Sequence, residues 1–109
     1  MKLLFAIVQD DDANKLMSAL NKKGIHITKL SSSGGFLKSG NTTLITCIED
    51  ERINEALSII ESKCKSRSTL ARVNNNNESG MATPLTTEVS VNVGGATVFI
   101  TNIEDFRKF

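Results

Sequence analysis

The residues best suited to chemistry lie in one stretch, SSSGGFLKSGNTT, at positions 31–43. Its glycines and serines allow successive backbone N–H groups to turn toward an anion, and Lys38 adds a positive charge. Phe36 offers an aromatic face on which a nucleobase can stack. The amide of Asn41 can pair with an adenine edge through one donor and one acceptor. The stretch is therefore compatible with a hairpin loop, a phosphate cradle or a nucleotide-binding segment.

Sequence context removes one of these interpretations. A P-loop needs a glycine directly before its lysine, and it must open a helix after a strand. Here Leu37 precedes Lys38, and β-branched residues follow. The remaining residues fit a nucleotide site and a small hydrophobic plug of Phe36 and Leu37 about equally well.

No other grouping points to catalysis or to a metal. His26 is the one histidine, and neither cysteine nor any serine forms a nucleophile motif with it. The aspartates at 10–12 are explained by their place at a helix start. Cys47 and Cys64 lack ligand spacing and are expected to be free thiols in a reducing cytoplasm. We expect no enzymatic activity, metal or cofactor; a small enzyme that uses His26 as a base remains a minor hypothesis.

The overall composition is that of an ordinary soluble domain. The chain has 109 residues, a net charge of +1 and 39% hydrophobic residues. One domain is expected at this length, without strong attraction to nucleic-acid polymers or insertion into membranes. The N-terminal MKLLFAIVQDDD is expected to form a buried strand and not a secretory signal.

Hydrophobic periodicity predicts the elements. Apolar residues at 13, 16, 17 and 20 form one helix face, after which Gly24 ends the helix. A second such stripe runs from Ile53 to Cys64. Strands are expected at 2–8, 25–31, 42–49 and 87–101, the last interrupted by Gly94 and Gly95, whereas 65–86 lacks periodicity and is expected to form a long loop.

The resulting order, β-α-β-β-α-β with an elaborated last strand, predicts an α+β, ferredoxin-like fold. Two helices would cover one face of an antiparallel sheet. Apolar residues available for the other face suggest a homo-oligomer.

The sequence also resembles a known family. The segments FAIVQDDD, TKLSSSGGFLKSGNTTL, VNVGGATVFI and DFRKF are similar, from residue 1 to residue 109, to the PII-like cyclic-di-AMP receptor proteins (the PstA/DarA family). The resemblance implies one PII-like domain over 1–109 that assembles into a homotrimer. Residues 34–40 would be a short T-loop and 65–86 an enlarged B-loop.

The function implied by this resemblance is signal transduction in the cytoplasm. Cyclic di-AMP would bind between subunits and reorder the loops, which would alter contacts with a protein target. The alternative is an adaptor that acts through its 65–86 loop without a nucleotide.

The resemblance also assigns the ligand-binding residues. Thr28 and the backbone of residues 35–37 would face phosphates and riboses, Phe36 would pack on an adenine, and Asn41 would read the adenine edge. Phe99 would lie beside the pocket. His26, Cys47 and Lys108 are assigned to the same site, where other members carry arginine, glycine and glutamine. The full set is Thr28, Gly35, Phe36, Leu37, Asn41, Cys47, Phe99, His26 and Lys108.

The stacking role of Phe36 can be tested directly. Phe36→Ala should weaken nucleotide binding by roughly 1–3 kcal/mol, the usual contribution of one base–aromatic stack. Isothermal titration calorimetry measures this loss. An unchanged affinity would identify Phe36 as a packing residue.

Overall fold

The protein consists of strands and two α-helices. Its computed structural model describes residues 1–30, 40–75 and 85–109. A 3-10 turn at Asp50–Arg52 leads into the second helix. The elements are β1 (Lys2–Gln9), α1 (Asp10–Lys22), β2 (Thr28–Leu30), β3 (Asn41–Ile48), α2 (Ile53–Cys64), β4 (Arg67–Asn75), β5 (Leu85–Val93) and β6 (Ala96–Asn102).

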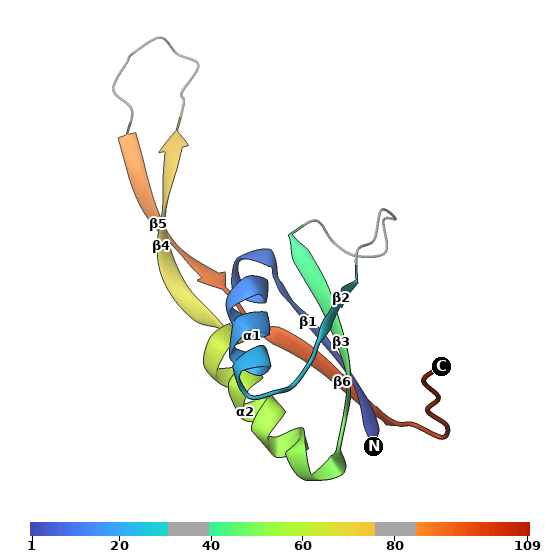
Figure 1. Ribbon diagram of the computed structural model, residues 1–109. Coiled ribbons are helices and arrows are strands. Elements are labelled where there is room, and N and C mark those ends of the chain that lie inside the picture. The colour runs from blue at the N-terminus through green and yellow to red at the C-terminus, as the bar shows by residue number, and fades with distance from the viewer. Residues whose placement is uncertain (31–39, 76–84) are drawn as a thin grey trace.

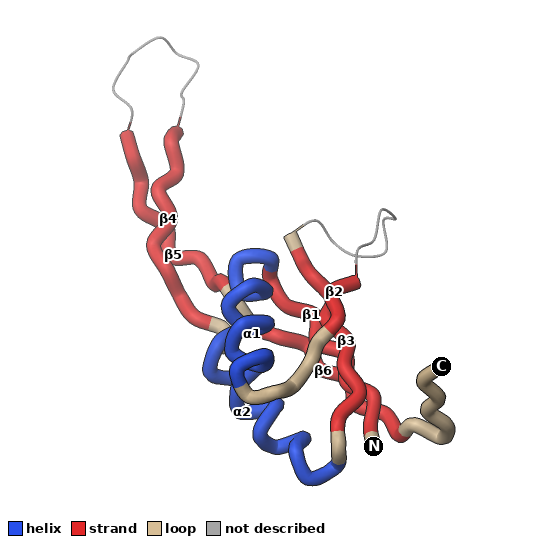
Figure 2. The backbone as a smooth tube through the Cα atoms, viewed as in Figure 1, coloured by secondary structure: helices blue, strands red, loops and turns tan. Residues whose placement is uncertain are grey.

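Four of the strands form one antiparallel sheet in the order β2-β3-β1-β6. Helices α1 and α2 lie on the same face of this sheet (Figure 1). Strands β4 and β5 form a separate two-stranded sheet, which projects away from the helices as an arm (Figure 2). This α+β arrangement is compatible with the predicted ferredoxin-like fold.

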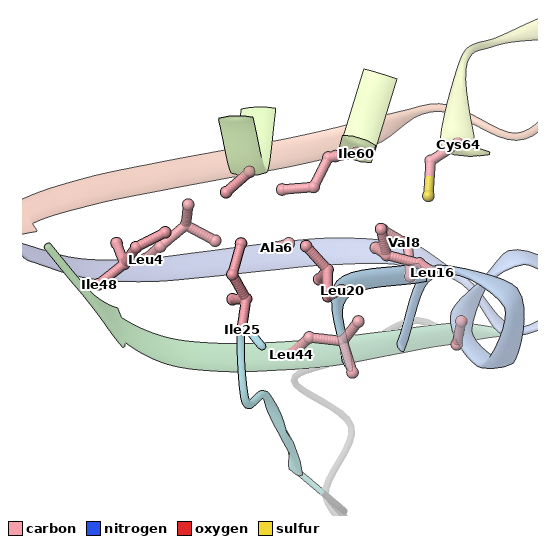
Figure 3. Close-up of a cluster of buried hydrophobic side chains, with 12 residues drawn as sticks. Leu4, Ala6, Val8, Leu16, Leu20, Ile25, Leu44, Ile48, Ile60 and Cys64 are labelled. Atoms are coloured by element: carbon pink, nitrogen blue, oxygen red, sulfur yellow. The ribbon is translucent and has the colours of Figure 1, made fainter. Parts of the chain in front are cut away.

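The core lies between the four-stranded sheet and the helices (Figure 3). Alternate residues of β1, Leu4, Ala6 and Val8, are at most 1% exposed. They meet the predicted helix stripes, since Leu16 of α1 and Ile60 of α2 belong to the same cluster. The two amphipathic helices predicted from periodicity are therefore confirmed, and Gly24 has the left-handed φ of +73° expected of a helix stop.

The prediction of a loop over 65–86 is wrong for residues 67–75 and 85–86, which form strands, and residues 76–84 lie outside the described residues. Residues 67–75 form β4, which pairs with β5 from Arg67↔Val93 to Asn75↔Leu85. The predicted strand at 25–31 also begins later, at Thr28, and is described as far as Leu30. Backbone pairing with β5, the next strand along the chain, stabilises β4, whose own sequence carries no strong apolar pattern.

The glycine pair predicted to interrupt the last strand lies where the chain leaves the arm and enters the main sheet. Gly94 has a φ of +80°, and a Cβ atom there would lie 2.8 Å from the Lys65 carbonyl oxygen. Its N–H donates to Gln9 Oε1 at 2.7 Å. Only glycine meets both the conformational and the steric requirement at this junction.

A buried carboxylate connects the arm to α1. Asp12 is 1% exposed, and its Oδ1 lies 2.9 Å from Arg67 Nη2 at the start of β4 and 3.0 Å from Lys15 Nζ. Arg67 Nη1 also donates to Asp12 Oδ2 at 3.4 Å and to the Lys65 carbonyl at 3.1 Å. The hydrogen bond from Arg67 lowers the pKa of Asp12 from its ordinary value, against the opposing effect of burial.

This lowered pKa predicts how stability depends on pH. Because the pKa of Asp12 is lower in the folded than in the unfolded chain, ionised Asp12 stabilises the fold fully above about pH 4, the ordinary value for an aspartate. The contribution is lost as the pH falls through the folded-state pKa. Asp12→Asn should therefore lower the unfolding free energy at pH 7, with a difference from wild type that shrinks below about pH 4.

Thermal unfolding of wild type and variant between about pH 2.5 and about pH 7, a range that brackets the ordinary aspartate pKa of about 3.9, measures this difference. Asp11→Asn is the matched control, because Asp11 is in the same helical turn and is exposed. Equal losses for the two variants at pH 7 would contradict a special role for Asp12.

Candidate functional site

The face of the main sheet opposite the helices, here termed the open face, carries most of the predicted ligand residues that the structure describes. Strand pairing places directly opposed residues on the same face. Leu3, Phe5 and Ile7 of β1 alternate with its core residues and are half-buried. Their register partners therefore also lie on the open face.

The register assigns four predicted residues to this face. Thr28 pairs with Ile45, which pairs with Phe5, and Phe5 pairs with Phe99. Cys47 is opposite Leu3, and Asn41 is opposite Gln9. Thr28, Cys47 and Phe99 are exposed, whereas Asn41 is half-buried. The prediction that residues 26, 28 and 30 share the side opposite residues 25 and 27 agrees with the burial of Ile25.

The same register separates these residues into two groups. Thr28 and Asn41 belong to adjacent strands, β2 and β3, with Asn41 four residues along β3 from the Ile45 that pairs with Thr28, whereas Phe99 is on β6 at the other edge. Thr28 and Phe99 are therefore three strand spacings apart, about 14 Å. Within one chain, Thr28 and Phe99 lie at opposite edges of the same apolar face.

His26 and Cys47 line a common cavity of about 160 Å³, together with Arg52 and Glu49. The backbone there is fixed by Thr46, whose hydroxyl donates to the His26 carbonyl oxygen at 2.6 Å. Arg52 Nη2 donates to the Lys23 carbonyl at 2.5 Å. The cavity thus has an imidazole, a thiol and side chains of both charges at the end of β3, near Thr28.

The other predicted residues are not brought to this place. Lys108 is exposed in the segment after β6, beside an ion pair between Arg107 and Asp105 at 2.9 Å. Gly35, Phe36 and Leu37 lie outside the described residues. A larger hollow of about 420 Å³ between α2 and β6 contains none of the predicted ligand residues and is lined by Leu57, Cys64 and Val98, among others.

Sequence reasoning missed the residues that support the site from the first turn of α1. Asp10 accepts a hydrogen bond from the Thr42 hydroxyl, and the Asp10 N–H donates to the Gly40 carbonyl at 2.8 Å. Gln9, opposite Asn41, binds Gly94. The aspartates lie in the first turn of α1 as predicted, but the N-cap is Gln9 and no side chain caps the helix. Only the tertiary structure identifies the long-range partners of Asp10 and Asp12.

The described residues contain no group of three or more histidine, cysteine or acidic side chains suited to a metal ion. Within the same ranges, no helix is long and apolar enough to cross a membrane. The open face thus contributes hydroxyl, amide, thiol and aromatic groups on an apolar background. Such groups suit recognition of an organic ligand with polar edges.

Comparisons with known proteins agree with this description. The family model described as cyclic-di-AMP receptor matches residues 1–109. A solved structure titled as a functionally unknown protein from Pediococcus pentosaceus ATCC 25745 is similar, with a TM-score of 0.76 and 41% sequence identity. The alignment covers 99% of this chain and 96% of that one.

The fold and the open face define a small α+β ligand-binding protein. The chain belongs to the cyclic-di-AMP receptor family, as its sequence predicted. This is a family of nucleotide receptors in signalling and not a known family of enzymes.

The two cysteines should differ in reactivity. Cys64 is fully buried, and burial, reinforced by the charge of Asp12, raises the pKa of its thiol. Cys47 is exposed. Because the thiolate is the reactive form, N-ethylmaleimide should modify Cys47 alone in the native protein and both residues after unfolding.

Intact-protein and peptide mass spectrometry distinguish these products. A Cys47→Ser variant, which should take up no reagent while folded, is the control. Rapid modification of Cys64 in the folded protein would contradict the described core.

Proposed function

We propose that the protein binds cyclic di-AMP between the subunits of a homotrimer. Ligand binding changes the arrangement of the 34–40 and 65–86 segments and thereby the contacts with a protein target. The observation that carries the proposal is the division of the site: Thr28 and Asn41 lie at one edge of the open face, and Phe99 lies at the other. A site that uses both edges is completed when β6 of one chain lies beside β2 and β3 of the next.

The apolar character of the open face supports assembly. Strand β1 is apolar at every position from Leu3 to Val8, yet only alternate side chains are buried in the single chain. Phe99 is 57% exposed. Covering these side chains with a second copy removes apolar surface from water, at about 25 cal/mol per Å². Assembly in this way leaves no open apolar face.

The C-terminal segment supports the same geometry. Phe106 is 55% exposed, and Phe109 is also exposed. They flank Lys108, which is exposed in the same segment. In a trimer, this segment reaches the ligand site of a neighbour and places Lys108 beside the phosphates.

The chemistry of each group fits one part of the ligand. The Thr28 hydroxyl and the backbone of residues 35–37 donate hydrogen bonds to phosphate and ribose oxygens. Phe36 stacks on one adenine, and the Asn41 amide pairs with an adenine edge. His26 and Cys47 line the cavity at the other end of β3 from Asn41, on the side of Thr28.

The contacts of α1 provide a physical route from ligand to arm. Asn41 is opposite Gln9, and Gln9 accepts the hydrogen bond from Gly94 at the end of β5. Asp10 and Asp12 bind residues on both sides, at Gly40 and at Arg67. A change in the 34–40 segment therefore acts on the same helical turn that fixes the base of the arm.

Calorimetric titration with cyclic di-AMP, cyclic di-GMP and ATP tests the binding. We expect saturable binding of cyclic di-AMP with one ligand per chain, and much weaker binding of the other two, because Asn41 reads an adenine edge and the site accommodates a cyclic dinucleotide. Light scattering coupled to size-exclusion chromatography should give three times the mass of one chain. Cyclic di-AMP should also slow the alkylation of Cys47.

The outcomes separate the parts of the proposal. Absence of cyclic di-AMP binding at micromolar concentration would refute the ligand. A monomer that binds with full affinity would refute the intersubunit site. Phe99→Ala leaves the Thr28 edge intact. If the protein is a monomer, this variant should bind cyclic di-AMP as tightly as wild type. If it is a trimer, weaker binding by the variant supports a site shared between subunits.

A further inference from the structure

Strand β3 contains three buried threonines, and one of them has an unpaired hydroxyl. Thr42 donates to Asp10 Oδ1, and Thr46 donates to the carbonyl oxygen of His26 at 2.6 Å. Thr43 is only 8% exposed. Its Oγ1 is the buried side-chain polar atom that has no hydrogen-bond partner among the residues the structure describes.

An unpaired buried hydroxyl has a cost. The group loses its hydrogen bonds to water on folding and gains none in return. Valine has nearly the same shape and would fill the same space without that cost. A threonine here is thus a poorer choice than valine for packing alone, and native proteins rarely leave such groups unsatisfied without another role.

The position of Thr43 suggests what that role is. Thr43 is opposite Ile7 on β1 and opposite Leu30 on β2, so its side chain is on the open face. Asn41 is two residues away on the same face, about 7 Å along the strand. Thr28, opposite Ile45, is the diagonal neighbour of Thr43, at about 7–8 Å.

We propose that the Thr43 hydroxyl is a further ligand-contacting group, which hydrogen-bonds the adenine that Asn41 reads. This inference rests on the proposed function. A hydroxyl both donates and accepts, and an adenine edge presents both kinds of partner. Thr43 is buried, whereas Thr28 is exposed. Because burying a planar base costs less free energy than burying a charged phosphate, the base is the part of the ligand that suits Thr43. The ligand thus supplies the partner that the free protein lacks.

The proposal predicts opposite effects on stability and on binding. Thr43→Val should raise the melting temperature of the ligand-free protein by about 4 °C or more, because it removes an unsatisfied polar group. The same variant should bind cyclic di-AMP about tenfold more weakly in calorimetric titration. Thr43→Ser, which keeps the hydroxyl, should retain most of the affinity.

Two further variants sharpen the test. Thr42→Val, one residue away but facing the helices, loses a satisfied bond to Asp10 and should lower the melting temperature. The double variant Asn41→Ala/Thr43→Val should lose less binding free energy than the two single variants lose together, since both groups contact one base. Fully additive losses would refute the shared adenine.

Other outcomes overturn the inference in distinguishable ways. If wild type and Thr43→Val bind cyclic di-AMP equally, the proposed function stands and the role of Thr43 is refuted. If Thr43→Val melts at a lower temperature without ligand, the hydroxyl is already bonded in the assembled protein, and the inference fails. If wild type itself does not bind, the failure belongs to the proposed function and removes the basis for Thr43 as well.

Discussion

The buried carboxylate of Asp12 connects the two parts of the molecule, because it joins helix α1 of the main domain to the base of the β4–β5 arm. At 1% exposure it must be paired, and its partners are Lys15 within α1 and Arg67 at the base of the arm. An unpaired charge in that position would be strongly destabilising. The pair contributes specificity more than net stability, because Arg67 can satisfy Asp12 only when β4 leaves α2 in one direction. Gly94 complements it, since any side chain there would collide with Arg67 and Lys65.

The first turn of α1 extends this constraint to the ligand face. Gln9, Asp10 and Asp12 are nearly consecutive, yet they bind Gly94, the pair Gly40 and Thr42, and Arg67 respectively. Gln9 and the first helical turn therefore hold the start of β3, which follows the 31–39 segment, and both strands at the base of the arm. The coupling proposed between nucleotide and arm needs no long chain of contacts, because the two segments meet at the same turn. It does need two arrangements of that turn with different affinities for ligand.

Much of the fold could be predicted from the sequence, and the limits have a physical origin. Both helices and the strands β1 and β3 carry periodic or continuous apolar patterns, so local sequence specifies them. The strand nature of 67–75 was missed because its sequence, RSTLARVNN, lacks such a pattern and depends on pairing with residues 85–93. The sequence predicted which residues belong to the candidate site. It did not predict that these residues are divided between the two edges of the main sheet, because that division follows from the strand order. The pairing of Asp12 with Arg67 depends on a contact across 55 residues. The Thr43 hydroxyl, which has no partner among the described residues, is identified by its burial, and neither feature is visible in a single sequence.

The open face combines two requirements that are usually met by different surfaces. Its apolar centre, around Phe5 and Ile45, favours a second copy, and its edges carry the polar groups proposed for the ligand. If Thr28 and Phe99 of different chains contact one nucleotide, assembly and binding are thermodynamically linked. Ligand then stabilises the assembled state by mass action, and assembly raises affinity by the same factor. In the proposed assembly, the concentration of the ligand thus sets the arrangement of the subunits, and the arm, which Arg67 ties to Asp12 of α1, moves with them.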